Sequence, residues 1–149
     1  MFAQLDTKSV YSFMDSVVDL NSYVARAKEL GYQALGLMDR DNLYAAYHFA
    51  QIASRHGLHP LIGMEANLFY EGRKIPFRLL AKNNQGYKNL MKLATELSSG
   101  QRELTAFSDY LNAIALILPS EDWESGMTLG SEVFIGVRPE DAAKEFDYP

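Results

Sequence analysis

The sequence predicts an α/β fold in which parallel strands form a sheet or barrel with helices on the outside. Segments typical of strands alternate with segments typical of helices, without a long linker or a low-complexity tract. Such alternation is characteristic of parallel strands joined by helices. The apolar runs Ala34–Met38 and Ala113–Leu118 are continuous rather than alternating, as expected of strands covered on both faces.

Each predicted strand is a short apolar run rich in β-branched, aromatic or aliphatic residues. A polar loop over 6–15 follows the first strand, and Glu71 with Gly72 forms a turn after the third, so that the fourth returns beside it. The predicted strands are Phe2–Leu5, Ala34–Met38, Pro60–Met64 with an extension to Tyr70, Ile75–Ala81, Ala113–Leu118 and Val133–Val137.

Capping residues and glycines mark the predicted helices. Asp19 or Asn21 caps the first helix, Asp41 with Asn42 the second, and Asn83 with Asn84 the third. Gly31, Gly57 and Gly100 follow the three helix ends. The predicted helices are Asn21–Leu30, Leu43–His56, Gln85–Ser98, a short one near Thr105–Leu111 and a last short one over Pro139–Glu145.

Composition restricts the possible classes of protein. A chain of 149 residues that is 48% hydrophobic can bury one core and is expected to form one domain. It has no cysteine, which excludes disulfides, thiolate zinc sites and a cysteine nucleophile. It has neither an apolar run long enough to span a membrane nor the pattern of a signal peptide. The predicted location is therefore the cytoplasm, with no membrane partner.

Charge is distributed unevenly along the chain, whose net charge is −5. Residues 73–102 hold seven of the fourteen basic side chains. These residues form either solvated helix faces or a local phosphate-facing patch, and the first interpretation is favoured because the whole chain is acidic.

Three carboxylates directly follow predicted strand cores: Asp6, Asp39 and Glu65. Functional groups of α/β folds lie just beyond the carboxyl ends of strands, and carboxylates there suit hard metal ions or acid–base chemistry. The alternative is structural, with Asp39 paired to Arg40 or another neighbour.

The histidines, at positions 48, 56 and 59, lack metal-ligand spacing and are expected to be structural or on the surface. No glycine-rich phosphate loop or serine-nucleophile motif is present.

Four segments follow one another along the chain: Tyr11–Asp15, Ala34–Leu43, Gly57–Glu65 and Leu79–Leu93. Their order and spacing resemble one family, the polymerase and histidinol phosphatase (PHP) domain. Tyr11–Asp15 is similar to its YSLLDG-like loop, and Ala34–Leu43 to its strand ending in Thr-Asp-His-Gly-Asn-Leu. Gly57–Glu65 resembles its Gly-Ile-x-Pro-Ile-x-Gly-x-Glu segment. Leu79–Leu93 is similar to the LLAKN…GYKNL signature of the branch found in alpha subunits of bacterial DNA polymerase III. The resemblance implies a partial, distorted β/α barrel related to the TIM barrel.

The resemblance also implies a metal site, from which this sequence departs. Active PHP domains bind metals through a His-x-His, an Asp-His and a Glu. The His-x-His falls on Asp6-Thr7-Lys8, the Asp-His on Asp39-Arg40, and the glutamate is kept as Glu65. Lys8 and Arg40 place permanent positive charges where metal ions would bind. The five positions Asp6, Lys8, Asp39, Arg40 and Glu65 are therefore interpreted as a degenerate site without metal or catalytic residue, in which two cations balance the carboxylates.

The resemblance places residues 1–149 as the front part of a PHP domain that ends before the later ligand-bearing strands. Polymerase chemistry, with its magnesium cofactor, would belong to the parent enzyme, and this part would be a structural and interaction module in DNA replication. Its partners would be the rest of the polymerase chain and other replisome subunits, with DNA contacted only through the parent. The alternative is a metal-dependent phosphoesterase or a proofreading 3′–5′ exonuclease domain. The open edge of Val133–Val137 also predicts a possible homodimer.

Overall fold

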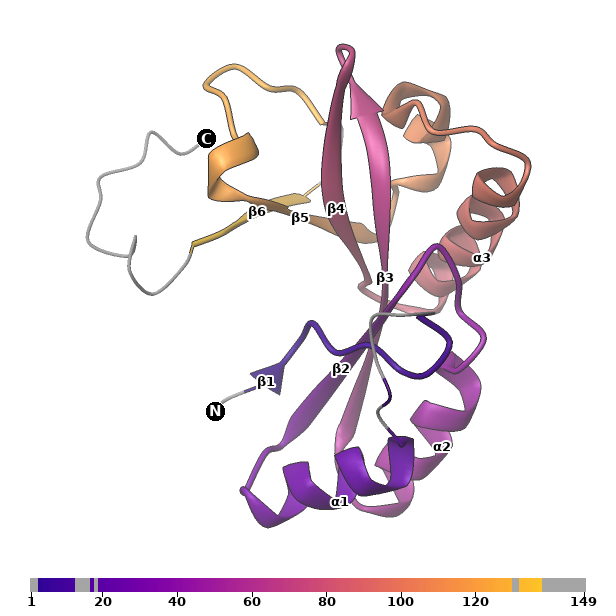
Figure 1. Ribbon diagram of the computed structural model, residues 1–149, viewed down its shortest axis with the longest axis vertical. Coiled ribbons are helices and arrows are strands. Elements are labelled where there is room, and N and C mark those ends of the chain that lie inside the picture. The colour runs from indigo at the N-terminus through magenta and orange to yellow at the C-terminus, as the bar shows by residue number, and fades with distance from the viewer. Residues whose placement is uncertain (1–2, 13–16, 18, 130–131, 138–149) are drawn as a thin grey trace.

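In the computed structural model, six strands form one curled sheet that resembles part of a barrel (Figure 1). The structure describes residues 3–12, 17, 19–129 and 132–137. The predicted last helix, Pro139–Glu145, lies outside them. The strands are β1 (Ala3–Gln4), β2 (Ala34–Arg40), β3 (His59–Tyr70), β4 (Arg73–Ala81), β5 (Ile114–Pro119) and β6 (Glu132–Gly136), and they lie side by side in sequence order.

The sheet is parallel at both ends and antiparallel in the middle. β1, β2 and β3 are mutually parallel, as are β5 and β6. β4 runs antiparallel to both β3 and β5, because the turn at Glu71 and Gly72 returns the chain directly beside β3. The predicted parallel strands with outer helices are confirmed, and the hairpin places a reversed strand among them.

The described residues form three α-helices and two 3₁₀-helices around the sheet: α1 (Leu20–Glu29), α2 (Ala46–Arg55), α3 (Asn84–Ser98), η1 (Leu104–Tyr110) and η2 (Ser120–Asp122). Asp19 caps α1 by accepting a hydrogen bond from the Ser22 N–H at 2.9 Å. Asn83 caps α3 by accepting one from the Gly86 N–H at 3.0 Å. Both caps agree with the prediction. No helix in the described ranges is both long and apolar enough to cross a membrane.

The predicted start of the second helix was wrong. Helix α2 begins at Ala46, with no side-chain cap, rather than at Leu43 after an Asp41–Asn42 cap. Asn42 instead accepts a hydrogen bond from the Tyr44 N–H at 3.1 Å and stabilises the turn before the helix. Asp41 has a left-handed backbone with a φ of 56°, and its carboxylate accepts hydrogen bonds from Arg102 instead of capping the helix.

Two hydrophobic clusters lie along the sheet. One contains α1, α2 and β2, and the other contains α3, η1 and the middle strands. The long strand β3 contributes to both, through Ile62 to the first and through Met64 and Leu68 to the second.

The segment after β1 lies unusually close to β2. A Cβ atom on Gly36 would lie 2.2 Å from the backbone oxygen of Leu5, so only glycine permits this approach. The Met38 N–H donates to the Thr7 carbonyl at 2.7 Å and continues the contact past the end of β1. This packing fixes Asp6 and Lys8 beside the end of β2 and the middle of β3.

Candidate functional site

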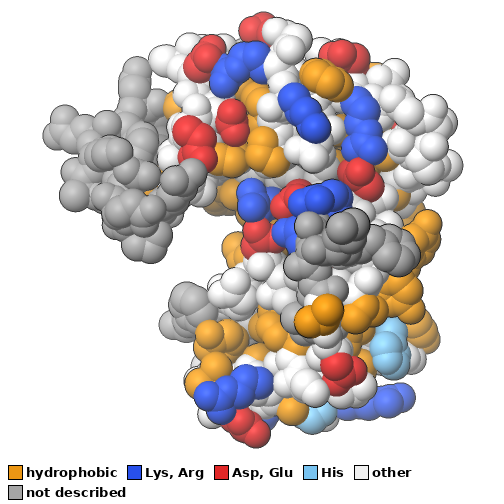
Figure 2. Space-filling view, viewed as in Figure 1, with side chains coloured by type: hydrophobic (Ala, Val, Ile, Leu, Met, Phe, Trp, Pro, Cys, Tyr) orange, Lys and Arg blue, Asp and Glu red, His pale blue; other side chains and the backbone are white. Residues whose placement is uncertain are grey.

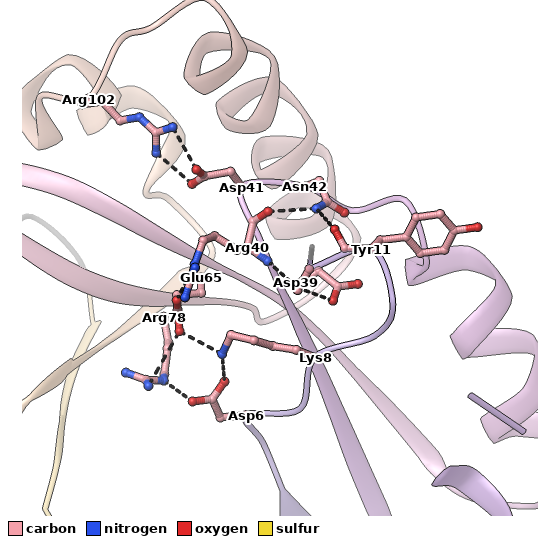
Figure 3. A network of polar contacts seen from close by, with 11 residues as sticks. Asp6, Lys8, Tyr11, Asp39, Arg40, Asp41, Asn42, Glu65, Arg78 and Arg102 are labelled. Atoms are coloured by element: carbon pink, nitrogen blue, oxygen red, sulfur yellow. Dashed lines mark hydrogen bonds and ion pairs between the residues drawn. The ribbon is translucent and has the colours of Figure 1, made fainter. Parts of the chain in front are cut away.

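Four of the predicted site residues meet on one side of the sheet (Figure 3). Three charged residues lie side by side on neighbouring strands. Arg40 of β2 is the register partner of Glu65 of β3, and Glu65 is in turn the register partner of Arg78 of β4. Asp6 and Lys8 reach the same place from the segment after β1. The structure therefore brings Asp6, Lys8, Arg40 and Glu65 together.

Lys8 occupies the centre of the group. Its Nζ lies 2.9 Å from Glu65 Oε2 and 3.1 Å from Asp6 Oδ1. Its side chain is 17% exposed and that of Glu65 only 7%. The ammonium group thus bridges two carboxylates in a largely dehydrated position, where the attraction between opposite charges is stronger than it is in water.

Two arginines complete the network. Arg40 Nε donates to Glu65 Oε1 at 3.1 Å, and Arg78 Nε donates to Asp6 Oδ2 at 2.5 Å. Arg78 Nη2 also lies 3.8 Å from Glu65 Oε2. Each oxygen of Asp6 and of Glu65 therefore faces at least one cation, as burial of two carboxylates requires. We refer to Asp6, Lys8, Arg40, Glu65 and Arg78 as the ion-pair network.

The pKa values of two members reflect these contacts. Burial alone would raise the pKa of Asp6, but hydrogen bonds from Arg78 and Lys8 hold it below the ordinary value of 3.8. Burial alone would lower the pKa of Lys8, but its bonds to Glu65 and Asp6 hold it above the ordinary 10.5. Both shifts favour the charged forms, so Asp6 and Lys8 remain ionised across the neutral range.

Asp39 does not belong to the network, so the prediction that Lys8 and Arg40 balance it was wrong. Within the described part of the chain it forms no ion pair. Its carboxylate, in a residue 2% exposed, accepts hydrogen bonds from the Ser9 N–H and from the hydroxyls of Ser9 and Ser12, at 2.6–2.7 Å. Successive side chains of a strand point to opposite faces, which separates Asp39 from Arg40.

Asp41 pairs with a residue far along the chain. Its two oxygens accept hydrogen bonds from Arg102 Nη1 and Nη2, each at 2.8 Å. This two-point geometry is typical of arginine with a carboxylate. The Asp41–Arg102 pair connects the end of β2 to the segment before η1 and is a structural contact.

The sequence reasoning missed Arg78, Ser9 and Ser12. A signal for Arg78 was present, because a hairpin turned by Glu71 and Gly72 places residue 78 opposite residue 65. No comparable signal marked Ser9 and Ser12, since both lie in an irregular loop whose course depends on tertiary packing.

The residues present do not fit the metal cluster that the family resemblance implies. The Lys8 ammonium lies between the carboxylates of Asp6 and Glu65, where a shared metal ion would bind. Among the residues that the structure describes, no group of three or more histidines, cysteines or acidic residues is arranged to hold a metal ion. The three histidines are exposed: His48 lies in α2, His56 directly follows it, and His59 is the first residue of β3.

Most of the basic stretch 73–102 is engaged in ion pairs. Arg73 pairs with Glu124 and Asp122, Arg78 with Asp6, Lys82 with Glu132 and Arg102 with Asp41. On the face shown in Figure 2, basic and acidic side chains are interspersed. Paired cations are poor phosphate ligands, so this arrangement favours the interpretation of a solvated structural surface.

The sequence profile of the PHP domain matches residues 4–125. The chain belongs to the PHP domain family. Within this PHP domain, the match includes all members of the ion-pair network.

Similar sequences are polymerases. The PHP domain is 47% identical over 137 residues to the DNA polymerase III subunit alpha of Streptococcus pyogenes serotype M1. It is 33% identical over 126 residues to that of Bacillus subtilis, and 38% identical over 103 residues to an error-prone DNA polymerase of Corynebacterium glutamicum. The streptococcal match covers 92% of this chain but 13% of that relative's length. The chain thus corresponds to a small part of these polymerases.

Two solved structures share the fold. One, from Bifidobacterium adolescentis and named as a metal-dependent phosphoesterase, has a TM-score of 0.53 at 16% identity and covers 63% of this chain and 32% of its own. The other, an amidohydrolase from Chromobacterium violaceum, has a TM-score of 0.53 at 19% identity and covers 66% and 34%. These likenesses confirm the barrel-related α/β fold.

Proposed function

We propose that this PHP domain is a structural and interaction module of a DNA polymerase III alpha subunit and that it has no phosphoesterase activity of its own. The observation that carries the proposal is the position of Lys8, whose ammonium bridges Asp6 and Glu65. The sequence similarity to alpha subunits supports the polymerase context.

The electrostatics of the network support a metal-free locus. A divalent cation between Asp6 and Glu65 would have to displace Lys8, and it would remain close to the guanidinium groups of Arg40 and Arg78. Like charges at such distances in a partly buried site cost several kcal/mol. The ion pairs instead provide the charge balance that metal ions would provide in an active relative.

In this proposal, magnesium and the polymerase reaction, which extends DNA from deoxynucleoside triphosphates, belong to other parts of the parent enzyme. The partners of the domain are the remaining polymerase chain and other replisome subunits, and the cytoplasm is its location. DNA is contacted through the parent, in agreement with the internally paired basic residues of β4 and the segments that follow it.

Hydrolysis assays with added metals test the proposal. We expect no release of nitrophenolate from bis-p-nitrophenyl phosphate, and no shortening of 3′-labelled single-stranded DNA, with Mn²⁺, Zn²⁺ or Mg²⁺. Metal-dependent turnover that disappears in Glu65→Gln, while Arg26→Ala on the exposed face of α1 leaves it unchanged, would establish the phosphoesterase or proofreading exonuclease alternative instead.

A further inference from the structure

A groove lies between helices α2 and α3, over the boundary of strands β3 and β4. It contains two cavities, of about 360 Å³ and about 310 Å³, and Tyr87 of α3 lines both. Asn84, at the start of α3, lines the larger cavity, and Ser98, at its end, lines the smaller. We refer to the two cavities together as the α2–α3 groove. The groove follows the whole of α3, a length of about 21 Å at 1.5 Å per residue.

No described helix fills this groove, and the strand order explains why. Helix α2 is the crossover between the parallel strands β2 and β3, and it packs against both. Strands β3 and β4 are antiparallel and are joined by a hairpin turn, so no crossover helix covers their boundary. The floor of the groove is this boundary, because it contains Ile62 of β3 and Ala81 of β4, directly beyond the register pair Gly63–Leu80. Both walls and the floor lie within residues 41–98, in the interior of the chain.

Apolar and aromatic side chains are exposed along the groove. Tyr44, in the loop before α2, is 75% exposed, Tyr47 of α2 is 71% exposed, and Met91 of α3 is 43% exposed. Hydrophobic side chains gather on the side of the molecule where α2 and α3 lie (Figures 1 and 2). Two small residues, Ala46 and Ala50, face the groove from α2, so a further helix can approach this wall closely. An exposed apolar groove of this kind is typical of a protein interaction site.

The charges around the groove suit an acidic occupant. Among the described residues that line its cavities, Asp41 is the one acid, and Arg102 neutralises it through two hydrogen bonds of 2.8 Å. Lys88 is exposed and forms no ion pair within the described ranges. It lies on the rim, because it follows Tyr87 directly and is three residues before Met91 on the same helix. The start of α3, at the same end of the groove, also carries the positive end of the helix dipole.

We propose that the α2–α3 groove binds an amphipathic helix of a partner protein. The apolar face of that helix contacts Tyr47, Tyr87 and Met91, and its acidic residues lie toward Lys88 and the start of α3. The helix takes the position that a crossover helix holds between two parallel strands, and about 14 residues span the length of α3. Binding of a helix in a groove uses apolar anchors at positions i, i+3 or i+4 and i+7. The inference rests on the proposed role of this domain as an interaction module and states the kind of partner.

A helix of another protein is favoured over single-stranded DNA and over a second copy of this chain. Bases could stack on the tyrosines, but the phosphates would need a row of unpaired cations, and most basic residues of the 73–102 stretch are already paired. A second copy offers no acidic amphipathic helix, because α2 contains no acid and α1 and α3 contain one each.

Three synthetic peptides of about 14 residues test the proposal by nuclear magnetic resonance of the isotope-labelled chain. The first has leucine at positions i, i+3, i+4 and i+7 and so on, with glutamate and alanine elsewhere. The second replaces each glutamate with lysine, and the third has the composition of the first in scrambled order. We expect only the first to shift the amide signals of Ala50, Tyr87 and Met91. The readout is peptide contact rather than hydrolysis, so this proposal and the proposed function fail separately.

Variants locate the contact. Met91→Glu should weaken binding of the acidic peptide by about tenfold or more, because it places a like charge in the groove. Lys88→Glu, at an exposed helix position, should also weaken it and serves if Met91→Glu does not fold. His48→Glu, on α2 but outside both cavities, is the matched control and should bind as the wild type does. Circular dichroism checks the fold of each variant.

Four results would each overturn the proposal. One is the absence of any shift at up to about 1 mM of the acidic peptide. The second is equal binding of the basic or the scrambled peptide, and the third is an affinity that Met91→Glu and Lys88→Glu leave unchanged. The fourth is a shift of the same amide signals by oligothymidylate instead of by the acidic peptide, which would identify the groove as a site for single-stranded DNA.

Discussion

The Nζ atom of Lys8 lies 2.9 Å from Oε2 of Glu65, a carboxylate whose side chain is only 7% exposed. Glu65 is the strand residue that the family resemblance assigns to metal binding, and in this chain a lysine from the segment after β1 is its partner. The pair joins the N-terminal segment to the long strand β3. Its removal should affect the whole fold, because β3 contributes to both hydrophobic clusters.

Glu65→Gln should strongly destabilise the chain. The change removes one of the two carboxylate charges that face Lys8, Arg40 and Arg78 in a largely dehydrated position, at a cost of about 3–5 kcal/mol in the free energy of unfolding. Urea denaturation followed by circular dichroism measures the loss. Arg26→Ala is the control, because it removes an exposed pair with Glu29 and should cost less than about 0.5 kcal/mol. Equal effects of the two changes would contradict the structural role of the network.

The stability of the chain should depend on Asp6 at acid pH. The pKa of Asp6 is lower in the folded chain than its ordinary 3.8, so its contribution is present above pH 3.8 and is lost as the pH falls through the folded value. Asp6→Asn should be less stable than wild type at pH 7, and the difference should narrow below about pH 4. Urea midpoints measured from pH 7 to pH 2 provide the comparison, and a difference that stays constant would exclude the ionised contact.

The same reasoning applies to Lys8 at the alkaline end. Its pKa is raised above 10.5 in the folded chain, so its contribution is complete below that value and is lost as the pH rises through the folded value. Between these two limits the contributions of Asp6 and Lys8 to stability should be nearly constant.

A double-mutant cycle should couple Asp39 to Ser12 and not to Arg40. Asp39→Ala leaves the buried Ser9 N–H and the hydroxyls of Ser9 and Ser12 without their acceptor, at about 1–3 kcal/mol for each unsatisfied group. Asp39→Ala with Ser12→Ala should cost less than the sum of the single changes by about 0.5–3 kcal/mol. Asp39→Ala with Arg40→Ala should be additive. Unfolding free energies of the six chains decide the question, and coupling only to Arg40 would restore the ion-pair interpretation.

Gly36→Ala should destabilise the chain by about 3 kcal/mol or more, because its new methyl group would overlap the Leu5 carbonyl. The control is Gly136→Ala, where the nearest atom, the Leu118 carbonyl oxygen, is 3.6 Å from the added Cβ. Thermal unfolding of both variants tests whether the close approach of the N-terminal segment to β2 is required. Similar melting temperatures would show that it is not.

The contrast between Asn83 and Asp41 shows how far the sequence predicts this fold. Asn83 and Asp19 were recognised as caps because a capping side chain bonds to a backbone N–H three residues away. Asp41 has the same local appearance, but its partner Arg102 lies 61 residues further along the chain. A contact at that separation depends on tertiary packing, and no local pattern reveals it.

The candidate site likewise contains contacts that follow from local strand geometry and contacts that depend on tertiary packing. The position of Glu65 followed from its place in a strand, and its contact with Arg78 could have been inferred from the hairpin register. The predicted contact of Asp39 with Arg40 is wrong because residues that are adjacent in a strand point to opposite faces of the sheet. The strand geometry that separates them is elementary, but it applies only once β2 is known to extend to Arg40.

Isothermal titration of the metal-stripped chain with Zn²⁺ and Mn²⁺ tests the central claim, that ion pairs occupy the place of the metals. We expect no stoichiometric binding at the locus of Asp6 and Glu65. Asp6→Asn serves as the comparison for any heat that is observed, since it removes one carboxylate of that locus. Stoichiometric binding tighter than about 10 μM, equivalent to about −7 kcal/mol, that is lost in Asp6→Asn would show that the ion pairs do not exclude metal ions from this locus.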